Sequence, residues 1–316
     1  MNLDEASIRD LQWDEILDLL SLQCQQPTAR QRCQTLRPYT HRQQLQETLN
    51  EMHEIMGIFQ SGAHLPAGEF YEIPRTLQLL QVRDSVLSED DFQKIISNPT
   101  IDHDWISLKS HVGENWSSLQ RYFQGIEPHP EIIEEVFKIF NSQWQIRDDA
   151  SPLLISIRES MMQVRRQITK NFQKVLRDMQ SKGYIAATEE NYQNERKVLA
   201  VISSYKKKVS GIITGSSKTG SITFIEPSIN IALNNEMEIL KEEELQEIRK
   251  ILAQLTQKIR HQLPFFVASE KLLIQMDFLR AKSKLGGMYQ GIIAELTDSP
   301  SLDIRQAVHP LLFIQH

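Results

Sequence analysis

Residues 151–182, SPLLISIRESMMQVRRQITKNFQKVLRDMQSK, decide the predicted fold because their apolar side chains recur at intervals of three and four. That spacing places one apolar stripe along a helix. Ser151 is expected to cap this helix, with Pro152 at its first position. The stripe consists of Leu154, Ile157, Met161, Val164, Ile168, Phe172, Val175 and Met179.

A second stretch, residues 229–263, repeats nearly the same rhythm. Its apolar residues are Leu233, Met237, Leu240, Leu245, Ile248, Leu252, Leu255, Ile259 and Leu263. Two such stripes can bury only each other or the body of the protein, which predicts a pair of long antiparallel helices. At a rise of about 1.5 Å per residue each would be roughly 45 to 50 Å long. We therefore expect the segment between them to be held away from the rest of the protein.

The insert between the two helical stretches is β-like. Short β-branched runs at residues 197–202, 209–214 and 221–225 are separated by Gly and Ser. They predict a small antiparallel sheet at about 195–228, with residues 215–220 as a hairpin loop and Pro227 ending the last strand. The predicted fold class is therefore mainly α: a helical core with two long antiparallel helices and a small antiparallel β unit inserted between them.

The insert is basic although the whole chain carries a net charge of −6. Between residues 200 and 222 the charged side chains are Lys206, Lys207, Lys208 and Lys218. Such ammonium groups, with the hydroxyls of Ser216, Ser217 and Thr219 and nearby backbone N–H groups, suit contact with nucleic-acid phosphates. The alternative is an ordinary solvated hairpin whose lysines prevent edge-to-edge strand pairing.

The first helical stretch also has an excess of basic side chains, with only Glu159 and Asp178 as acidic ones. The basic residues are Arg158, Arg165, Arg166, Lys170, Lys174, Arg177 and Lys182. These either continue the basic surface of the insert toward a nucleic acid or form the solvated flank of a coiled coil. Too few aromatic residues are interleaved with the basic ones to stack bases, which favours contact with the backbone.

No motif predicts catalysis or a cofactor. Gly215 and Gly220 have the separation of P-loop glycines, but Ser221 and Ile222 stand where that loop requires Lys and Ser or Thr. The nine histidines form no set with metal-ligand spacing, and no serine or cysteine has the setting of a nucleophile. We predict no catalytic residue, no metal and no cofactor in this chain.

Composition predicts an ordinary soluble protein without a membrane segment. The 316 residues are 40% hydrophobic and 24% charged, contain no run of 18 apolar residues and begin with an acidic segment that has no apolar signal core. A cytoplasmic location is expected. Cys24 and Cys33, nine residues apart on a predicted helical stretch, are not expected to face each other well and are predicted to be reduced thiols.

The first 150 residues are predicted to be a helical core. Helical patterns cover residues 11–22, 27–37, 41–60, 71–80, 88–96, 105–123 and 131–144.

Several separate motifs, which follow one another along the chain in the same order as in the family, resemble the MutS-two branch of the MutS family. The runs at 211–227, GIITGSSKTGSITFIEP, and 232–236, ALNNE, resemble the family's β clamp and the start of its returning lever helix. Residues 146–158, 196–202 and 276–285 resemble the entry into the outgoing lever, the first clamp strand and the return to the core. Residues 304–312, IRQAVHPLL, resemble the strand that leads into the ATPase domain, but Ala307 and Val308 depart from the usual Ala-Arg.

The resemblance implies a layout: a helical core in residues 1–150, lever helices in 151–263 with the clamp at about 195–228, and a return helix in 264–316 that starts the linker into an ATPase domain. It covers essentially the whole chain but only the amino-terminal part of a family member. The P-loop ATPase domain, with its ATP and Mg²⁺, and the small nuclease domain are therefore expected to be missing.

The resemblance also implies a function: non-catalytic DNA binding within a DNA-dependent ATPase that forms a homodimer, acts on mismatched or branched DNA and suppresses recombination. The contacts would be Lys206, Lys207, Lys208, Ser216, Ser217, Lys218 and Thr219, with Arg165, Arg166 and Lys170 second. Family members have also been linked to stalled ribosomes, so ribosomal RNA is another candidate ligand. A rival hypothesis is an interaction scaffold whose coiled-coil arms bind a partner helix or a second copy.

Overall fold

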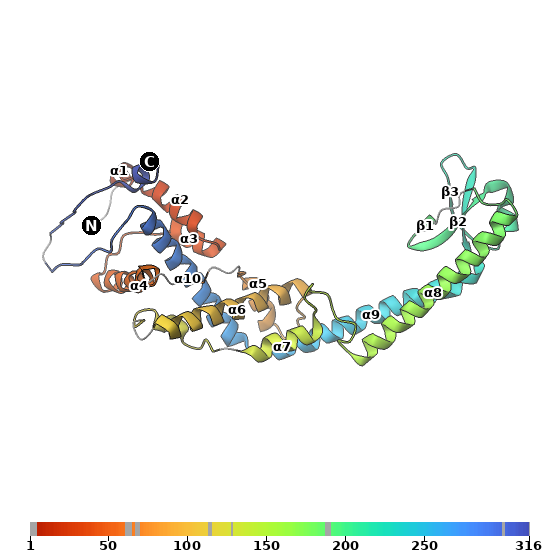
Figure 1. Ribbon diagram of the computed structural model, residues 1–316, viewed down its shortest axis with the longest axis horizontal. Helices are drawn as coiled ribbons and strands as arrows, with labels where there is room; N and C mark the ends of the chain where they lie inside the picture. Colours follow the sequence, from red (N-terminus) through yellow and green to blue (C-terminus); the bar gives the residue numbers. More distant parts are fainter. Residues whose placement is uncertain are drawn as a thin grey trace. The chain divides into compact units, whose positions relative to one another are not determined.

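A computed structural model describes residues 5–60, 65–66, 70–112, 116–127, 129–186, 191–298 and 301–315 (Figure 1). The prediction of a mainly helical protein with one small antiparallel sheet is confirmed. The chain divides into two compact units, one formed by Met1–Phe137 and Ala253–His316 and the other by Lys138–Leu252. In the described part, no helix is long and apolar enough to span a membrane.

The first unit is helical and is centred on α10 (Leu263–Met288), in which about half of the residues are buried and the buried ones lie on several faces of the helix. A helix of that kind belongs in the interior of a protein, and α10 packs against its neighbours α2 to α6. The other elements are α1 (Glu5–Asp10), α2 (Trp13–Gln23), α3 (Pro27–Gln34), α4 (Arg42–Gln60), α5 (Pro74–Gln81), α6 (Glu89–Val112), the 3-10 helix η1 (Gln120–Phe123), α7 (Pro130–Ile139), which runs into the second unit, and α11 (Pro310–Gln315).

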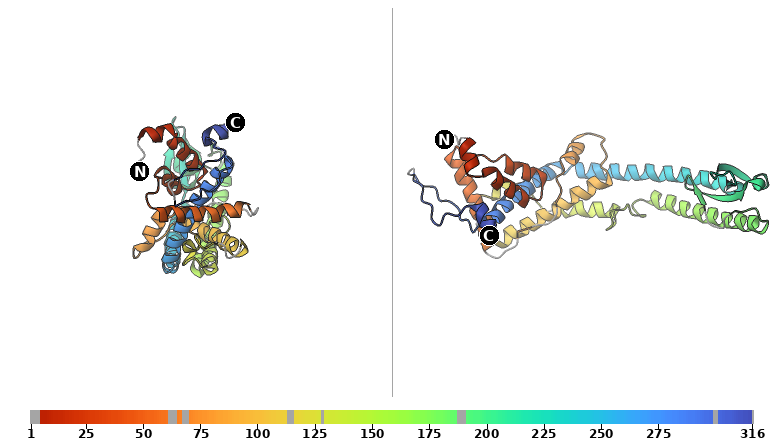
Figure 2. Two further views of the ribbon diagram at one scale, coloured as in Figure 1. Left: turned by 90° about the vertical axis from the view of Figure 1, so that its left-hand side faces the viewer. Right: turned by 90° about the horizontal axis from the view of Figure 1, so that it is seen from above.

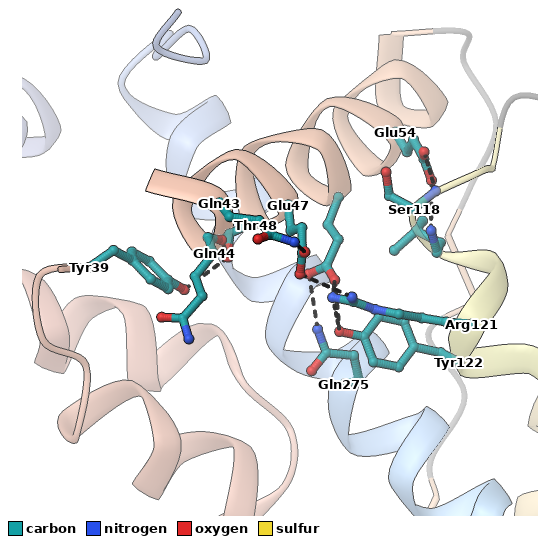
Figure 3. Close-up of polar contacts among 12 residues, drawn as sticks. Tyr39, Gln43, Gln44, Glu47, Thr48, Glu54, Ser118, Arg121, Tyr122 and Gln275 are labelled. Atoms are coloured by element: carbon teal, nitrogen blue, oxygen red, sulfur yellow. Dashed lines mark hydrogen bonds and ion pairs between the residues drawn. The ribbon is translucent and has the colours of Figure 1, made fainter. Parts of the chain in front are cut away.

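A polar network around Glu51 joins α4 to η1 and α10, and its partners Arg121, Tyr122 and Gln275 are labelled in Figure 3. The Glu51 carboxylate, on a residue only 4% exposed, accepts hydrogen bonds from the Tyr122 hydroxyl at 2.7 Å and the Gln275 amide at 3.4 Å, and it pairs with Arg121. A carboxylate is stable in such a place only when charge and hydrogen bonds compensate its burial. The network therefore fixes how three helical elements of this unit meet.

Helix α6 is continuous where two separate helices were predicted. The patterns at 88–96 and 105–123 are replaced by one helix from Glu89 to Val112 that contains Pro99, followed by the separate η1. An internal proline removes one backbone hydrogen bond. Ile96 and Ile101 are both buried on either side of Pro99, so packing keeps both halves helical despite the proline.

The prediction that Cys24 and Cys33 would not face each other is wrong. Their Sγ atoms lie 3.4 Å apart in the interior. Cys24 ends α2 and Cys33 lies on α3, so the chain reverses direction between them instead of continuing as one helix. Both are free thiols, as predicted.

The carboxyl-terminal strand implied by the resemblance is not observed. Residues 301–309 have no regular structure, and Pro310–Gln315 form the short helix α11. A strand needs a neighbour to satisfy its backbone groups. All four strands in the described part of the chain lie between residues 191 and 227 and pair with one another.

The second unit is built on two antiparallel helices, α8 (Pro152–Ser181) and the first part of α9 (Ser228–Arg260), seen from further directions in Figure 2. The Ser151 hydroxyl, which caps α8, donates to Glu247 at 2.7 Å, and Arg158 donates to Glu244 at 2.7 Å. Residue numbers thus fall along α9 as they rise along α8. A buried apolar cluster between the helices contains Val164, Ile168 and Met237.

The sheet of this unit has the strand order β1-β2-β4-β3, with every neighbouring pair antiparallel. Its elements are β1 (Asn191–Gln193), β2 (Arg196–Ile202), the 3-10 helix η2 (Ser203–Lys208), β3 (Gly211–Ser216) and β4 (Ile222–Pro227). The three predicted strands are confirmed to within two residues, whereas β1 was not predicted. The sheet is seated on α8 by a buried cluster of Phe172, Leu176, Met179, Leu199, Val201, Val209 and Ile225.

The buried carboxyl group of Asp102 predicts a pH-dependent stability of the first unit. Asp102 is 2% exposed, and neither of its carboxyl oxygens has a hydrogen-bond partner at bonding distance in the described part of the chain. Burial raises its pKa to about 7, although the nearby Ser269 hydroxyl lowers it. Below about pH 4 the group is protonated in both folded and unfolded chains, so it has no effect. As the pH rises toward 7, only the unfolded chain loses the proton, and the free energy of unfolding falls by up to about 4 kcal/mol.

Urea unfolding at a series of pH values measures this effect. We expect Asp102→Asn to flatten the decline in unfolding free energy between about pH 4 and pH 7, because an amide does not ionise. Asp104→Asn, an exposed position two residues away on α6, is the matched control and should keep the decline. An unchanged decline in Asp102→Asn would show that this carboxyl group is not its source.

Candidate nucleic-acid interface

The four lysines of the insert lie in two connections of the sheet. Lys206, Lys207 and Lys208 end η2, between β2 and β3, and Lys218 lies in the turn between β3 and β4. All four are exposed. Lys206, Lys207 and Lys218 have no carboxylate partner in the part of the chain that the structure describes. Their charge is therefore available to a ligand.

Lys208 differs from its neighbours because it lies against two aromatic rings. Its Nζ atom is 5.4 Å from the ring centroids of both Tyr184 and Tyr205. The two rings are stacked on each other, with centroids 4.7 Å apart and an interplanar angle of 25°. Tyr184 follows the end of α8 and Tyr205 belongs to η2, so this group attaches the basic turn to the end of the helix.

The predicted hydroxyl contacts are divided between a strand and a turn. Ser216 ends β3, where it pairs with Thr223, and was predicted in the loop. Ser217 closes the turn, because its Oγ accepts the Ile222 N–H at 3.1 Å, although its own O–H can still donate. Thr219 shares a 2.7 Å hydrogen bond with Ser221. Each hydroxyl is near the surface, but those of Ser217 and Thr219 also hold the turn together.

The predicted residues of α8 lie together in a shallow groove on the face opposite its buried stripe. The groove is lined by Met162, Arg165, Arg166, Thr169, Lys170, Gln173, Lys174 and Arg177. We call Arg165, Arg166, Lys170, Lys174 and Arg177 the basic stripe; all five are exposed. The Arg166 guanidinium lies 3.1 Å from the Met162 sulfur, and among the described residues none of the five has a carboxylate partner.

The stripe includes Lys174 and Arg177, which the sequence analysis counted in the basic excess of this helix but did not include among the predicted contacts. The signal was present, since positions 166, 170, 174 and 177 recur at the helical interval of three or four. From Arg165 to Arg177 the stripe spans roughly 18 Å of helix axis. That length corresponds to about five phosphates of one strand of duplex DNA.

A further lysine, Lys197, lies between the sheet and the stripe. It belongs to β2, yet its Nζ is 3.5 Å from the hydroxyl of Thr169, which lines the groove. The same ammonium lies 5.8 Å from the Phe172 ring and 5.9 Å from the Tyr192 ring. Sequence analysis missed this residue because it was counted only as part of a strand.

Taken together, this unit offers lysine and arginine side chains on two surfaces, with hydroxyl donors beside one of them. Such groups bind phosphate oxygens through charge and hydrogen bonding without selecting a base sequence. Among the residues that the structure describes, no group of three or more His, Cys, Asp or Glu is arranged to hold a metal ion.

Substitution of Lys208 tests its contact with the tyrosines. We expect Lys208→Ala to lower the free energy of unfolding by about 0.5 to 1 kcal/mol, because an exposed cation–π contact contributes about that much. Its near-ultraviolet circular dichroism should change as the stacked rings lose the ammonium. Lys207→Ala removes the same charge from the same turn without an aromatic contact and should leave that spectrum unchanged. Equal spectra for the two variants would contradict the assignment.

No protein-family model matches the chain, but curated proteins do. It is 24% identical over 312 residues to a protein named Endonuclease MutS2 from Aquifex aeolicus, covering 98% of this chain and 40% of the relative. Proteins of the same name from Agathobacter rectalis and Clostridium kluyveri are 27% and 26% identical, each over 98% of this chain and 39% of the relative. The chain is thus related to proteins named MutS2 and spans about 40% of their length.

Proposed function

We propose that this chain is a non-catalytic DNA-binding region of a MutS-like DNA-repair protein, which contacts the phosphate backbone of mismatched or branched DNA. In this proposal α8 and α9 act as levers and the sheet acts as the clamp. The observation that carries it is the concentration, on one unit of a chain whose net charge is −6, of exposed cations that have no carboxylate partner among the described residues. The relatives named Endonuclease MutS2 support the choice of DNA as the nucleic acid.

The proposed binding is electrostatic. A phosphate contact by Lys or Arg releases a condensed counterion from DNA, which makes affinity fall steeply with salt. Lys206, Lys207 and Lys218 would supply the first contacts and the basic stripe the second. Lys208 already contacts Tyr184 and Tyr205, so its ammonium would reach phosphate from a defined position. Phosphate contacts carry no sequence information, so the preference for branched or mismatched DNA would come from its shape and flexibility.

The proposal places ATP hydrolysis, Mg²⁺ binding and any nuclease chemistry in regions of a longer MutS-like protein that this chain does not contain. It also includes a homodimer as the working assembly and suppression of recombination as the cellular role. In such an assembly the present chain would bind DNA, and its core would support the levers.

Salt titration of DNA affinity tests the proposal. Fluorescence anisotropy would give Kd for a four-way junction, a mismatched duplex and a matched duplex at several salt concentrations. We expect Kd to rise steeply with salt, with the junction bound most tightly. Replacing Lys206, Lys207 and Lys218 together by Ala should reduce the slope of log Kd against log salt by roughly two to three, about 0.9 for each phosphate that is no longer neutralised.

The matched control replaces three exposed cations of the other unit, Arg83, Lys271 and Lys284, by Ala. It should leave the slope unchanged, because the same net charge is removed from residues that do not belong to the candidate interface. Absent or salt-insensitive DNA binding would contradict the proposal and support an interaction scaffold. Tighter binding to an RNA duplex of the same length would contradict the choice of DNA as the ligand.

A further inference from the structure

We infer that a polar cluster at the junction of the sheet with α9 fixes the orientation in which the sheet is presented to nucleic acid, and that Glu226 is its positioning residue. This inference rests on the proposed function, and it adds a group of residues that sets the orientation of the sheet lysines for binding. The cluster, called here the sheet–arm latch, consists of Glu195, Arg196, Glu226, Asn234, Asn235 and Lys241.

The carboxylate of Glu226 is the centre of the latch. Glu226 lies near the end of β4 and is 2% exposed. It accepts a hydrogen bond from the Asn234 amide at 2.7 Å and pairs with the Arg196 guanidinium at 3.2 Å. Arg196 begins β2 and Asn234 lies on the second turn of α9. One buried carboxylate therefore connects two neighbouring strands to the helix.

A second, more exposed set of contacts extends the connection along α9. The other Nη atom of Arg196 donates to the Asn235 side chain at 3.1 Å. Glu195, in the turn between β1 and β2, forms an ion pair with Lys241 at 2.6 Å. The β1–β2 hairpin is thus attached to α9 over two turns of the helix.

The latch supplies the polar contacts between the sheet and α9, and these are separate from the contacts that the sheet makes on the side of α8. β4 ends at Pro227 and α9 starts at Ser228, so one covalent joint links the sheet directly to the helix. On the side of α8 the sheet packs through an apolar cluster, and apolar burial is non-directional. The polar contacts on that side are the one between Lys197 and Thr169 and the backbone hydrogen bonds that join β2 to Tyr184 and Ala186, just after α8. Hydrogen bonds to charged groups have defined lengths and directions. The contacts on the α8 side therefore hold the sheet at the end of that helix, and the latch sets the orientation of the sheet relative to α9.

Orientation matters because the candidate interface has two parts. The sheet lysines lie in connections of the sheet, and the basic stripe lies on α8. One nucleic acid can contact both only when their separation and angle suit its backbone, and the gain in affinity from binding both parts disappears when the geometry forbids it. A loosened latch would leave every cation in place but reduce the contribution of the sheet lysines.

The inference also explains two motifs that the lysines leave unexplained. Glu226 is the acidic residue of the FIEP sequence, and Asn234 and Asn235 are the paired asparagines of ALNNE. The structure brings the acidic residue of one motif into contact with an asparagine of the other. Neither motif supplies a cation, so their polar residues serve the junction of the sheet with α9.

The first test measures the orientation of the sheet directly. Spin labels on Lys218→Cys and Glu243→Cys, both exposed sites outside the latch, report the distance from the sheet to α9 by electron–electron double resonance. Cys24 and Cys33 are buried, and the protein without added cysteines controls for their labelling. We expect Glu226→Gln to broaden the distance distribution. Glu236→Gln, an exposed neighbour on α9 with the same charge change, should leave it narrow.

Arg196→Gln provides a second variant at a less buried position, in case Glu226→Gln unfolds the sheet. It should broaden the distribution while the far-ultraviolet circular dichroism stays that of the unsubstituted protein. A narrow, unshifted distribution in a folded latch variant overturns the inference, whether or not the protein binds DNA.

The second test joins the latch to binding through a double-mutant cycle. In the unsubstituted protein, replacing Lys206, Lys207 and Lys218 by Ala should weaken junction binding by about tenfold or more. In the Glu226→Gln background the same replacement should have a clearly smaller effect, whereas the full effect should persist with Glu236→Gln. A full effect in both backgrounds overturns the inference but leaves the proposed function standing. Absence of any DNA binding overturns the proposed function. The distance measurement still decides whether the latch sets the orientation of the sheet relative to α9.

Discussion

The apolar seam between α8 and the first part of α9 is the constraint on which the second unit depends. Neither helix could keep its apolar stripe in water, and each stripe finds its partner in the other. Polar contacts at both ends of the seam fix its register: Ser151 with Glu247 near the start of α8, and the Asn230 amide with the Ile168 carbonyl at 3.1 Å further along. The sheet depends on this helix pair because it packs against the carboxyl-terminal part of α8.

Burial and charge are separated on α8 by helical periodicity. One face supplies the seam and the seat for the sheet, and the opposite face carries the basic stripe. The buried face needs no charge and the exposed face needs no packing, so a cluster of five cations can persist without internal partners. Repulsion among the cations is moderated by solvent at the exposed face, and phosphate would relieve it further.

Much of this fold could be predicted because its strongest signals are local. The apolar residues from Leu154 to Met179 correctly predicted α8, and the β-branched runs of the insert correctly predicted three strands. Predictions failed where distant packing decides the outcome. Pro99 lies inside a helix because both flanks are buried, and Cys24 meets Cys33 because the chain reverses between them. The polar contacts of Glu226 join residues on three elements, and no periodicity in the sequence reports such a contact.

In the candidate interface, too, the residues with a local sequence signal could be predicted and those placed by distant packing could not. The lysines of the insert and the basic excess of α8 were evident from composition. Lys197 could be recognised only once the structure showed that β2 approaches α8. The aromatic contacts of Lys208 likewise depend on η2 meeting the end of α8. That last contact has a thermodynamic consequence. A free lysine loses up to about 2 kcal/mol of rotamer entropy when a ligand immobilises it. Lys208, resting on Tyr184 and Tyr205, has lost part of that freedom during folding, so an anion arriving there encounters a charge that is already ordered.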